Sequence, residues 1–266
     1  MSAPVPITLV TGASGGIGAA LARVFAQNGH RLVLVARREV ELVAVAQRIA
    51  LAGVAAPIAL PMDLGAPGAC DRLAEELGRR GLEPGNVVNS AGYGLLGTAA
   101  TLDRGEQLSM IDLNVRVLTD LSLRWTDALA RHRGGVLNVG SITGFYPGPA
   151  MAVYHATKAY VLSFGEALHH ELKPKGVRVT TLCPGPAATE FMARAGVNAG
   201  DYPALMVHSA GRIARDGYDG FMAGRCLVVT GWTNKAVKVL PRLLPRGWVL
   251  KIAGFSQSGR RKALRR

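Results

Sequence analysis

The chain has 266 residues, of which 49% are hydrophobic. This length and composition are ordinary for one globular α/β domain and exclude a disordered or fibrous protein. Its three cysteines, Cys70, Cys183 and Cys226, lie far apart without metal-ligand spacing, so the sequence predicts neither a disulfide framework nor a metal site. No apolar run approaches the ~20 residues of a membrane-spanning helix. No basic segment like that of a signal peptide precedes the first apolar run, and we expect a cytoplasmic protein.

The net charge of +13 is concentrated near the C-terminus. Asp219 is the last acidic residue, and 11 of the 31 Lys and Arg residues follow it. The first 219 residues therefore hold 20 basic and 18 acidic residues, a net charge of only +2. The bulk of the chain is nearly neutral, and the basic character belongs to its final part.

Short apolar runs alternate along the chain with stretches of helical periodicity. The first run, residues 5–11, leads through a glycine-rich turn into an apolar helical stripe that includes Ile17, Leu21 and Phe25. Further strands are expected at 31–36, 56–60, 86–90, 136–141, 177–182 and 225–230, and the longest helices at 104–131 and 152–172. Residues 185–200 are rich in small side chains and read as a mobile loop with a short helix.

The expected strands are apolar on both faces, which is typical of parallel strands covered by helices on both sides. Right-handed crossovers then predict a single Rossmann-type, doubly wound α/β domain with about seven parallel strands. In such a fold, the ligand crevice lies at the carboxyl ends of the strands.

The first turn carries glycines at positions 12, 16 and 18. Glycine permits a sharp reversal, lets a phosphate approach the backbone and lets the helix pack closely on the strand. The positive end of the following helix dipole favours an anion there. The spacing differs from the commoner G-x-G-x-x-G, and an ordinary strand-to-helix turn remains an alternative for this motif alone.

Tyr154 and Lys158 are four residues apart and therefore share one face of the expected helix. A neighbouring cation favours phenolate, so we expect Lys158 to lower the pKa of Tyr154 from about 10, as suits a general acid/base. Ser141, at the end of a strand, can reach the same crevice and donate a hydrogen bond to a carbonyl. Taken singly, these residues could also be a surface pair and a turn serine.

Together the motifs resemble the short-chain dehydrogenase/reductase family over nearly all of residues 6–231. The matching residues occur in the family's order and spacing: residues 11–18, Asp63-Leu64, residues 89–92, Asn114, Ser141, residues 154–158 and Pro184-Gly185. Ser90 departs from the family's more usual second Asn in the 89–92 turn. We expect this change to be tolerated.

The resemblance implies a role for each catalytic residue. Tyr154 would be the acid/base, and Lys158 would lower its pKa and hydrogen-bond the nicotinamide ribose. Ser141 would orient and polarise the substrate carbonyl. Asn114 would help to hold a water molecule that links Lys158 to solvent as a proton relay.

The resemblance also assigns cofactor contacts to the strand ends. The cofactor-binding residues it implies are Gly12, Ser14, Gly16, Ile17, Gly18, Arg37, Asp63, Leu64, Asn89, Ala91, Gly92, Tyr154, Lys158, Pro184, Gly185 and Thr189. The choice of cofactor follows from the end of the second strand, where NAD enzymes of this architecture place an acidic residue. Here Ala36 is followed by Arg37 and Arg38, whose guanidinium groups can pair with a 2′-phosphate, so we expect NADP (NADPH).

The substrate is expected to be a small carbonyl or alcohol compound, and a lipophilic ketone fits best. The residues that suggest an apolar cleft are Tyr93, Leu95, Ile142, Phe145, Tyr146, Phe191 and Met192. Members of the family commonly pair through the helices expected here at 104–131 and 152–172, which implies a homodimer or homotetramer. The alternative function is a non-catalytic dinucleotide-binding regulator or a membrane-recruited module.

The pattern changes after the expected catalytic domain, residues 1–233. Residues 234–266 form a basic, amphipathic extension in which Pro241 and Pro245 predict two short helical pieces. A basic amphipathic segment that contains Trp248 suits peripheral contact with an anionic membrane surface, which would be the inner face of the membrane. Packing on the protein itself or on another subunit is the alternative. No nucleic-acid recognition motif accompanies the charge, so nucleic acid is not expected.

Overall fold

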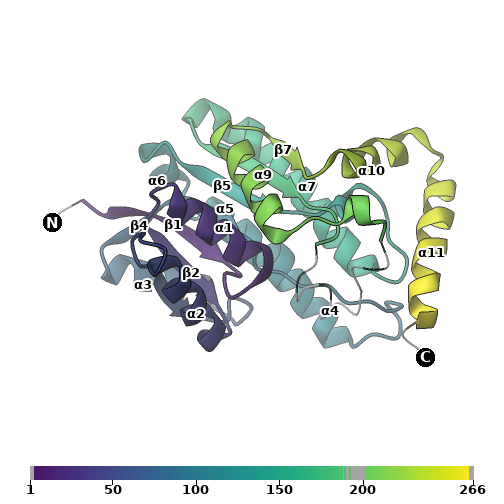
Figure 1. Ribbon diagram of the computed structural model, residues 1–266, viewed down its shortest axis with the longest axis horizontal. Coiled ribbons are helices and arrows are strands. Elements are labelled where there is room, and N and C mark those ends of the chain that lie inside the picture. Colours follow the sequence, from purple (N-terminus) through teal and green to yellow (C-terminus); the bar gives the residue numbers. More distant parts are fainter. Residues whose placement is uncertain (1–2, 188, 190–191, 193–199, 201, 264–266) are drawn as a thin grey trace.

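The computed structural model describes residues 3–187, 189, 192, 200 and 202–263. Their centre is a seven-stranded sheet in the order β3-β2-β1-β4-β5-β6-β7, with every neighbouring pair parallel. The strands are β1 (Val5–Thr11), β2 (Leu32–Ala36), β3 (Ile58–Pro61), β4 (Leu82–Asn89), β5 (Gly135–Val139), β6 (Arg178–Cys183) and β7 (Leu227–Val229). The predicted doubly wound α/β sheet is confirmed (Figure 1).

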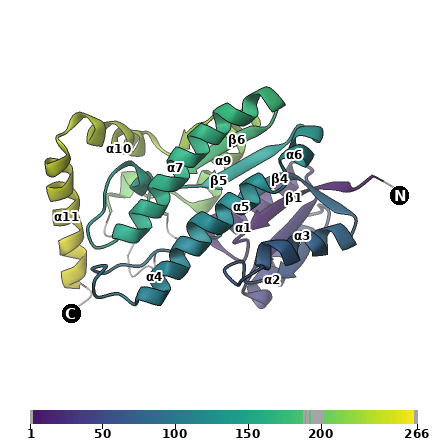
Figure 2. The same cartoon turned by 180° about the vertical axis from the view of Figure 1, so that it is seen from behind.

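Helices cover both faces of this sheet (Figures 1 and 2). On one face lie α1 (Gly16–Gln27), α2 (Glu39–Ala50) and α9 (Ala210–Met222). On the other lie α3 (Ala69–Arg79), α5 (Leu118–Leu123), α6 (Thr126–Arg131) and α7 (Ala152–Leu172). Helix α4 (Arg104–Ile111) lies beside α7 on this side (Figure 2). Short 3-10 turns occur at Ile142–Phe145, Lys173–Lys175 and Ala204–Met206.

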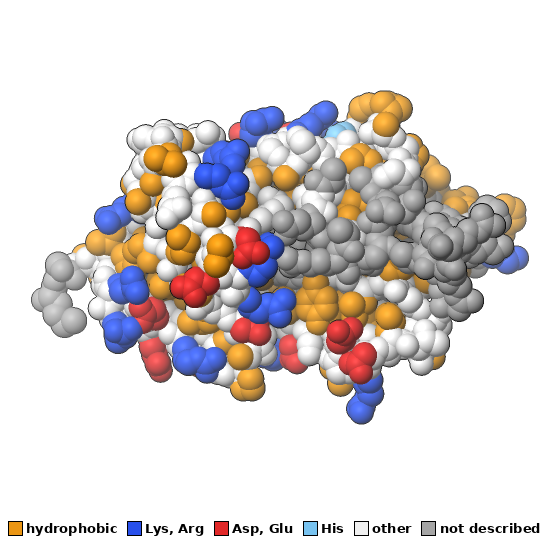
Figure 3. All heavy atoms as spheres, turned by 60° about the horizontal axis from the view of Figure 1, so that its bottom comes forward, with side chains coloured by type: hydrophobic (Ala, Val, Ile, Leu, Met, Phe, Trp, Pro, Cys, Tyr) orange, Lys and Arg blue, Asp and Glu red, His pale blue; other side chains and the backbone are white. Residues whose placement is uncertain are grey.

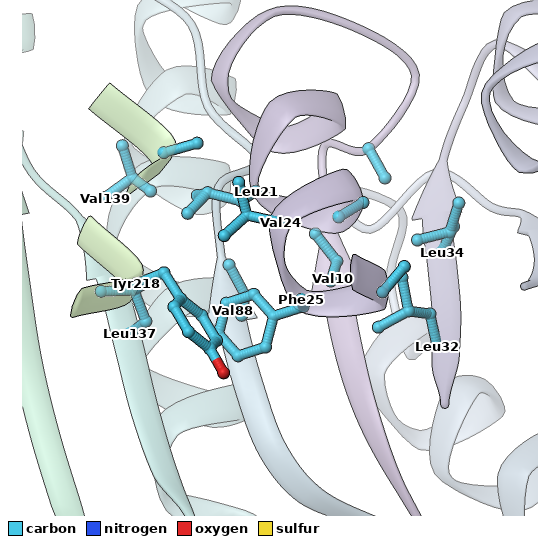
Figure 4. Close-up of a cluster of buried hydrophobic side chains, with 14 of the residues drawn as sticks. Val10, Leu21, Val24, Phe25, Leu32, Leu34, Val88, Leu137, Val139 and Tyr218 are labelled. Carbon is cyan, nitrogen blue, oxygen red and sulfur yellow. The ribbon is translucent and has the colours of Figure 1, made fainter. Parts of the chain in front are cut away.

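The core between the sheet and the first helical layer joins distant parts of the chain. Phe25 of α1 meets Tyr218 of α9 edge to face, with ring centroids 4.9 Å apart. Both rings lie over Val88 and Leu137 of the central strands (Figure 4). An aromatic pair of this geometry stabilises a fold by about 0.5–1.5 kcal/mol beyond the area it buries. This contact fixes α1, and hence the glycine turn before it, against the sheet.

The expected single helix over residues 104–131 is wrong, because the structure divides it. After α4, residues Asp112–Val117 form a π-helical turn, and a break at Trp125 separates α5 from α6. The π turn contains Asn114. Its side-chain oxygen accepts a hydrogen bond from the backbone N–H of Tyr93, and its side-chain NH2 donates one to the backbone carbonyl of Tyr93. Single π turns inside helices often mark functional sites, and helical periodicity alone does not reveal the extra residue.

The C-terminal part forms two helices, α10 (Trp232–Leu243) and α11 (Arg246–Ala263), as predicted. Only Pro245 lies at the break, because α10 continues through Pro241. The second helix is longer than expected. The sequence-based boundary after residue 233 falls within the first turn of α10, and the separate extension remains a proposal. No helix in the described part of the chain is long and apolar enough to cross a bilayer. Most of the loop expected at 185–200 lies outside the described residues.

Candidate active site

A cleft of about 790 Å³ opens at the carboxyl ends of the strands. It begins at the turn between β1 and α1, passes the ends of β2 and β4, and reaches the segments after β5 and β6. Of the residues expected to bind cofactor, these line it: Gly12, Ser14, Gly16, Ile17, Gly18, Arg37, Asp63, Leu64, Ala91, Gly92, Tyr154, Lys158, Pro184, Gly185 and Thr189. The strand order reverses beside β1, which is where open α/β sheets bind their ligands.

The glycine turn is shaped by close backbone contacts. Gly12 has φ +67°, and a Cβ there would lie 2.8 Å from the backbone of Ala91. A Cβ on Gly18 would lie 2.3 Å from the carbonyl oxygen of Gly12, so only glycine lets α1 approach the turn this closely. Thr11 Oγ1 accepts hydrogen bonds from the backbone N–H groups of Ser90 and Ala91, both at 3.1 Å. These contacts leave the N-terminus of α1 facing the cleft as a site for an anion.

Basic residues follow the second strand, as the sequence indicated. Arg37 lines the cleft directly after Ala36, and its Nη1 lies 3.9 Å from Oδ2 of Asp63. The Arg37 side chain is 61% exposed and can therefore turn towards a bound anion. Arg38 also lines the cleft and pairs with Glu41 at 3.0 Å. The end of β2 thus brings two guanidinium groups to the cleft, of which that of Arg38 is paired with Glu41.

Tyr154 lies in the first turn of α7 and is only 7% exposed. Burial raises the pKa of its phenol well above the usual value, while the nearby hydroxyls of Ser141 and Thr143 act in the opposite direction. Ser141 lies two residues after the end of β5 and caps the 3-10 turn Ile142–Phe145, because its hydroxyl accepts a hydrogen bond from the backbone N–H of Thr143 at 3.2 Å. Three hydroxyls therefore meet at one wall of the cleft, and the phenol carries its proton at neutral pH.

Lys158 lies one helical turn after Tyr154 and is 6% exposed. Its Nζ donates a hydrogen bond to the carbonyl oxygen of Val139 at 2.8 Å and lies 5.8 Å from the centroid of the Tyr154 ring. Burial lowers the pKa of Lys158 to about 8. The expected lowering of the Tyr154 pKa is wrong, because desolvation of the phenol is the largest influence on it and the ammonium is held by a backbone carbonyl.

Asn114 and Asn89 do not line the cleft but lie behind its wall. Asn114 is 1% exposed, and its Nδ2 donates hydrogen bonds to Tyr93 O at 2.9 Å and to Thr157 Oγ1 at 3.2 Å. A Cβ on Gly92 would lie 2.8 Å from Asn114 Oδ1 and 3.8 Å from Lys158 Nζ, so all three residues are close neighbours. Asn89 points into a buried network instead, where its Nδ2 donates to Asn138 Oδ1 at 2.9 Å and to Ser122 Oγ at 3.0 Å.

The wall around Tyr154 is largely apolar. Five of the residues expected there line the cleft: Tyr93, Leu95, Ile142, Tyr146 and Met192. Phe145 is not among the described lining residues, and Phe191 lies outside the described part of the chain. Sequence reasoning missed Thr143, Met151 and Tyr202, which also line this wall. Nothing local marks Met151 or Tyr202, whereas Thr143 could have been noticed as a second hydroxyl two residues after Ser141.

The described residues contain no group of three His, Cys, Asp or Glu side chains placed to hold a metal ion. The hydroxyls, the buried lysine, the glycine turn and the two arginines after β2 are among the chemical groups that the described cleft offers to a ligand.

Comparison with known proteins agrees with this geometry. The family model for short chain dehydrogenases matches residues 6–199. Sulfoacetaldehyde reductase 2 of Chromohalobacter salexigens is 35% identical over 188 residues, which are 70% of this chain and 74% of that protein. A short-chain dehydrogenase from Sphingobium yanoikuyae, solved with NADPH, is 32% identical with a TM-score of 0.78, over 98% of this chain and 95% of the other.

A second solved structure is the bulky-bulky ketone specific alcohol dehydrogenase from Comamonas testosteroni. It is 29% identical to this chain, with a TM-score of 0.73, over 85% of this chain and 86% of the other. The match of the family model covers most of the chain and the glycine turn, Ser141, Tyr154 and Lys158. The chain therefore belongs to the short-chain dehydrogenase/reductase family and is an oxidoreductase that binds a nicotinamide dinucleotide.

Proposed function

We propose that the enzyme is an NADPH-dependent reductase that converts a carbonyl group to a secondary alcohol, with Tyr154 as the acid. The observation that carries this proposal is the meeting of the Ser141, Thr143 and Tyr154 hydroxyls at one wall of a cleft that Arg37 lines at its other end. The reverse reaction, oxidation of the alcohol, would use the same groups.

The residues of the cleft fit NADPH. The turn at Gly12 and Gly18 has no side chain to obstruct a pyrophosphate, and the N-terminus of α1 favours its charge. Arg37 and Arg38 follow β2 where an NAD enzyme would carry a carboxylate, and a guanidinium pairs well with a 2′-phosphate. The NADPH bound to the Sphingobium yanoikuyae relative supports this choice. When bound, the nicotinamide supplies the hydride.

The protein's own residues supply the proton and the orientation. Ser141 would donate a hydrogen bond to the carbonyl oxygen and so hold the carbonyl carbon towards the nicotinamide. Tyr154, protonated because of its burial, would give its proton to that oxygen as negative charge develops on it. Lys158 would stabilise the phenolate left behind, and Asn114, beside Gly92 and Lys158, would help to relay a proton back from solvent.

The substrate we propose is a lipophilic ketone. The cleft near Tyr154 is lined by Leu95, Ile142, Met151 and Met192, and the other cations that line it, Arg37 and Arg38, follow β2 at its other end. Such a wall suits an apolar ligand better than a charged one. The names of the relatives indicate two different substrate classes, because one is specific for bulky ketones and another is a sulfoacetaldehyde reductase. The assay must therefore include both substrate classes.

The test combines turnover with a matched pair of tyrosine variants. We expect Tyr154→Phe to bind NADPH normally and to lose about 100- to 10,000-fold in kcat, because it lacks the transferred proton. Tyr218→Phe removes the hydroxyl of another buried tyrosine, in α9 outside the cleft, and should leave kcat unchanged. Oxidation of NADPH is followed with bulky ketones and with sulfoacetaldehyde.

Each outcome is informative. Turnover retained by Tyr154→Phe would overturn the proposed mechanism. Faster turnover of sulfoacetaldehyde than of bulky ketones would overturn the proposed substrate class. Tight NADPH binding by the wild-type protein with no turnover of either class would favour the regulator alternative.

We further propose a homodimer or homotetramer in the cytoplasm, with the catalytic domain in residues 1–233. Helices α4 and α5 follow each other through the π turn and lie beside α7 on one face (Figure 2). Their exposed apolar side chains are Leu108, Ile111, Leu123 and Tyr160, which supports pairing through this face. Peripheral contact of residues 234–266 with the inner face of a membrane belongs to the same proposal, and its structural basis follows.

A further inference from the structure

Helix α10 presents an apolar stripe to solvent. Trp232, Val239 and Leu243 lie seven and four residues apart, which places them on one face of the helix, and they are 75%, 50% and 75% exposed. On the opposite side Asn234 is fully buried, and its Nδ2 donates a hydrogen bond to Thr230 O at 2.9 Å. An amphipathic helix of a globular protein normally turns its apolar face to the core. In α10 the buried side carries the polar residue Asn234, and the apolar side with Trp232 and Leu243 is exposed to solvent.

Helix α11 also exposes apolar side chains. Val249 and Ala253, four residues apart, are buried against the body, and a Cβ on Gly254 would lie 3.7 Å from Pro149. Among the described side chains of α11, Trp248, Leu250 and Ile252 are exposed, at 64%, 42% and 58%. The C-terminal apolar surface, as we call it, consists of Trp232, Val239, Leu240, Leu243, Trp248 and Ile252.

Both helices lie at one end of the molecule (Figures 1 and 2). In Figure 3, some hydrophobic and basic side chains are visible at the edge of that end. Large contiguous apolar areas on a soluble protein usually mark a contact with a partner or a membrane.

The charges around the surface select the partner. Lys235, Arg246 and Lys251 are exposed beside it, and no acidic residue follows Asp219 anywhere in the sequence. A two-fold contact between copies through this surface would place these cations against one another. A nucleic acid would leave the exposed tryptophans and leucines without an apolar partner. An anionic lipid surface offers both an apolar layer and negative charge.

We propose that the C-terminal apolar surface lies on an anionic membrane, with its apolar side chains at the headgroup boundary and its lysines and arginines against lipid phosphates. Tryptophan is well suited to that boundary. Pro149, which α11 contacts, is close in sequence to Met151 of the cleft, so the docked end is also the end that carries the substrate wall. This proposal concerns a surface outside the catalytic residues and does not depend on the identity of the substrate.

Vesicle sedimentation of the full chain tests it. We expect binding to vesicles of mixed phosphatidylglycerol and phosphatidylcholine, little binding to phosphatidylcholine alone, and weaker binding as salt is added. Val239→Asp with Leu243→Asp should weaken binding by about tenfold or more, because it places charge within the apolar stripe. Val40→Asp with Leu51→Asp is the matched control, since these side chains are 79% and 87% exposed elsewhere.

A second pair separates charge from folding effects. Lys235→Glu with Lys251→Glu keeps the apolar stripe and should weaken binding to anionic vesicles by about tenfold or more. Both pairs should retain the circular dichroism of the wild type, because all four side chains are exposed. Point substitutions are preferable to truncation, which would remove the buried Asn234.

Three results would overturn the proposal. The first is that the wild-type protein binds no vesicle. The second is that the wild type and the Val239→Asp/Leu243→Asp variant bind equally well. The third is that the wild type binds no vesicle while this variant has a different native mass. The last result would identify a second copy of the chain as the occupant.

Discussion

At the scale of residues, burial sets the protonation of the two central groups. Tyr154 and Lys158 are both nearly enclosed, and desolvation disfavours the charged form of each. The pKa of the phenol therefore rises and the pKa of the ammonium falls. At neutral pH Tyr154 is protonated, as the proposed reduction requires, and Lys158 is the group whose charge changes just above neutrality.

This predicts the alkaline limit of the enzyme. Because the pKa of Lys158 is lowered to about 8, we expect kcat/KM for NADPH to fall as pH rises through about 8. The measurement is a pH profile of NADPH oxidation. A profile that stays flat until the phenol itself ionises would contradict the assignment.

The same pKa shift has the opposite effect on stability. The folded protein binds fewer protons at Lys158 than the unfolded chain, whose lysine has a pKa near 10.5, so this group makes folding more favourable as pH rises between about 8 and 10.5. Loss of activity in that range should therefore occur without loss of secondary structure. Circular dichroism at each pH provides the control.

At the scale of elements, the β1–α1 turn is built on contacts that exclude a side chain. We predict that Gly18→Ala destabilises the fold by about 1–3 kcal/mol and weakens NADPH binding, because its Cβ would meet the Gly12 carbonyl at 2.3 Å. Gly78→Ala in α3 is the matched control, since nothing lies within 4 Å of its Cβ. That change should stabilise the protein by about 0.5–1 kcal/mol. Urea denaturation and NADPH titration measure both, and equal effects of the two substitutions would contradict the argument.

At the scale of the whole molecule, the cleft is lined by segments from both halves of the sheet, from Arg37 after β2 to Pro184 after β6. A ligand that fills it should stabilise the entire domain. We predict that NADPH at a hundredfold excess over its Kd adds about 2.7 kcal/mol. For a domain of this size that raises Tm by roughly 5–10 °C.

The same experiment tests cofactor choice. NADH at equal concentration should raise Tm less, because Arg37 then has no 2′-phosphate to bind. Arg37→Ala should reduce the difference between the two cofactors, and its high exposure makes a direct effect on folding small. A larger shift with NADH would contradict the choice of NADPH.

Much of the fold was predictable because its signals are local. Apolar runs specify the strands, and the glycine turn and Asn28-Gly29 specify the ends of α1. Pro245 specifies the separation of α10 from α11, whereas Pro241 lies inside the last turn of α10. The i, i+4 spacing of Tyr154 and Lys158 specifies that they share a face of α7. The π turn around Asn114 was not predictable from local periodicity. Asn114 is hydrogen-bonded there to Tyr93, which lies 21 residues away along the chain.

The sequence by itself determined the alternating elements, the order of the motifs and the family resemblance, because each depends on neighbours along the chain. Only the tertiary structure decided how deeply those residues are buried and which groups they contact. It buried Tyr154 enough to reverse the expected pKa change, turned Asn89 away from the cleft and added Met151 and Tyr202 to the cleft wall. It also turned the apolar stripe of α10 outward. Desolvation and side-chain direction arise from contacts between distant segments, and no local pattern of residues encodes them.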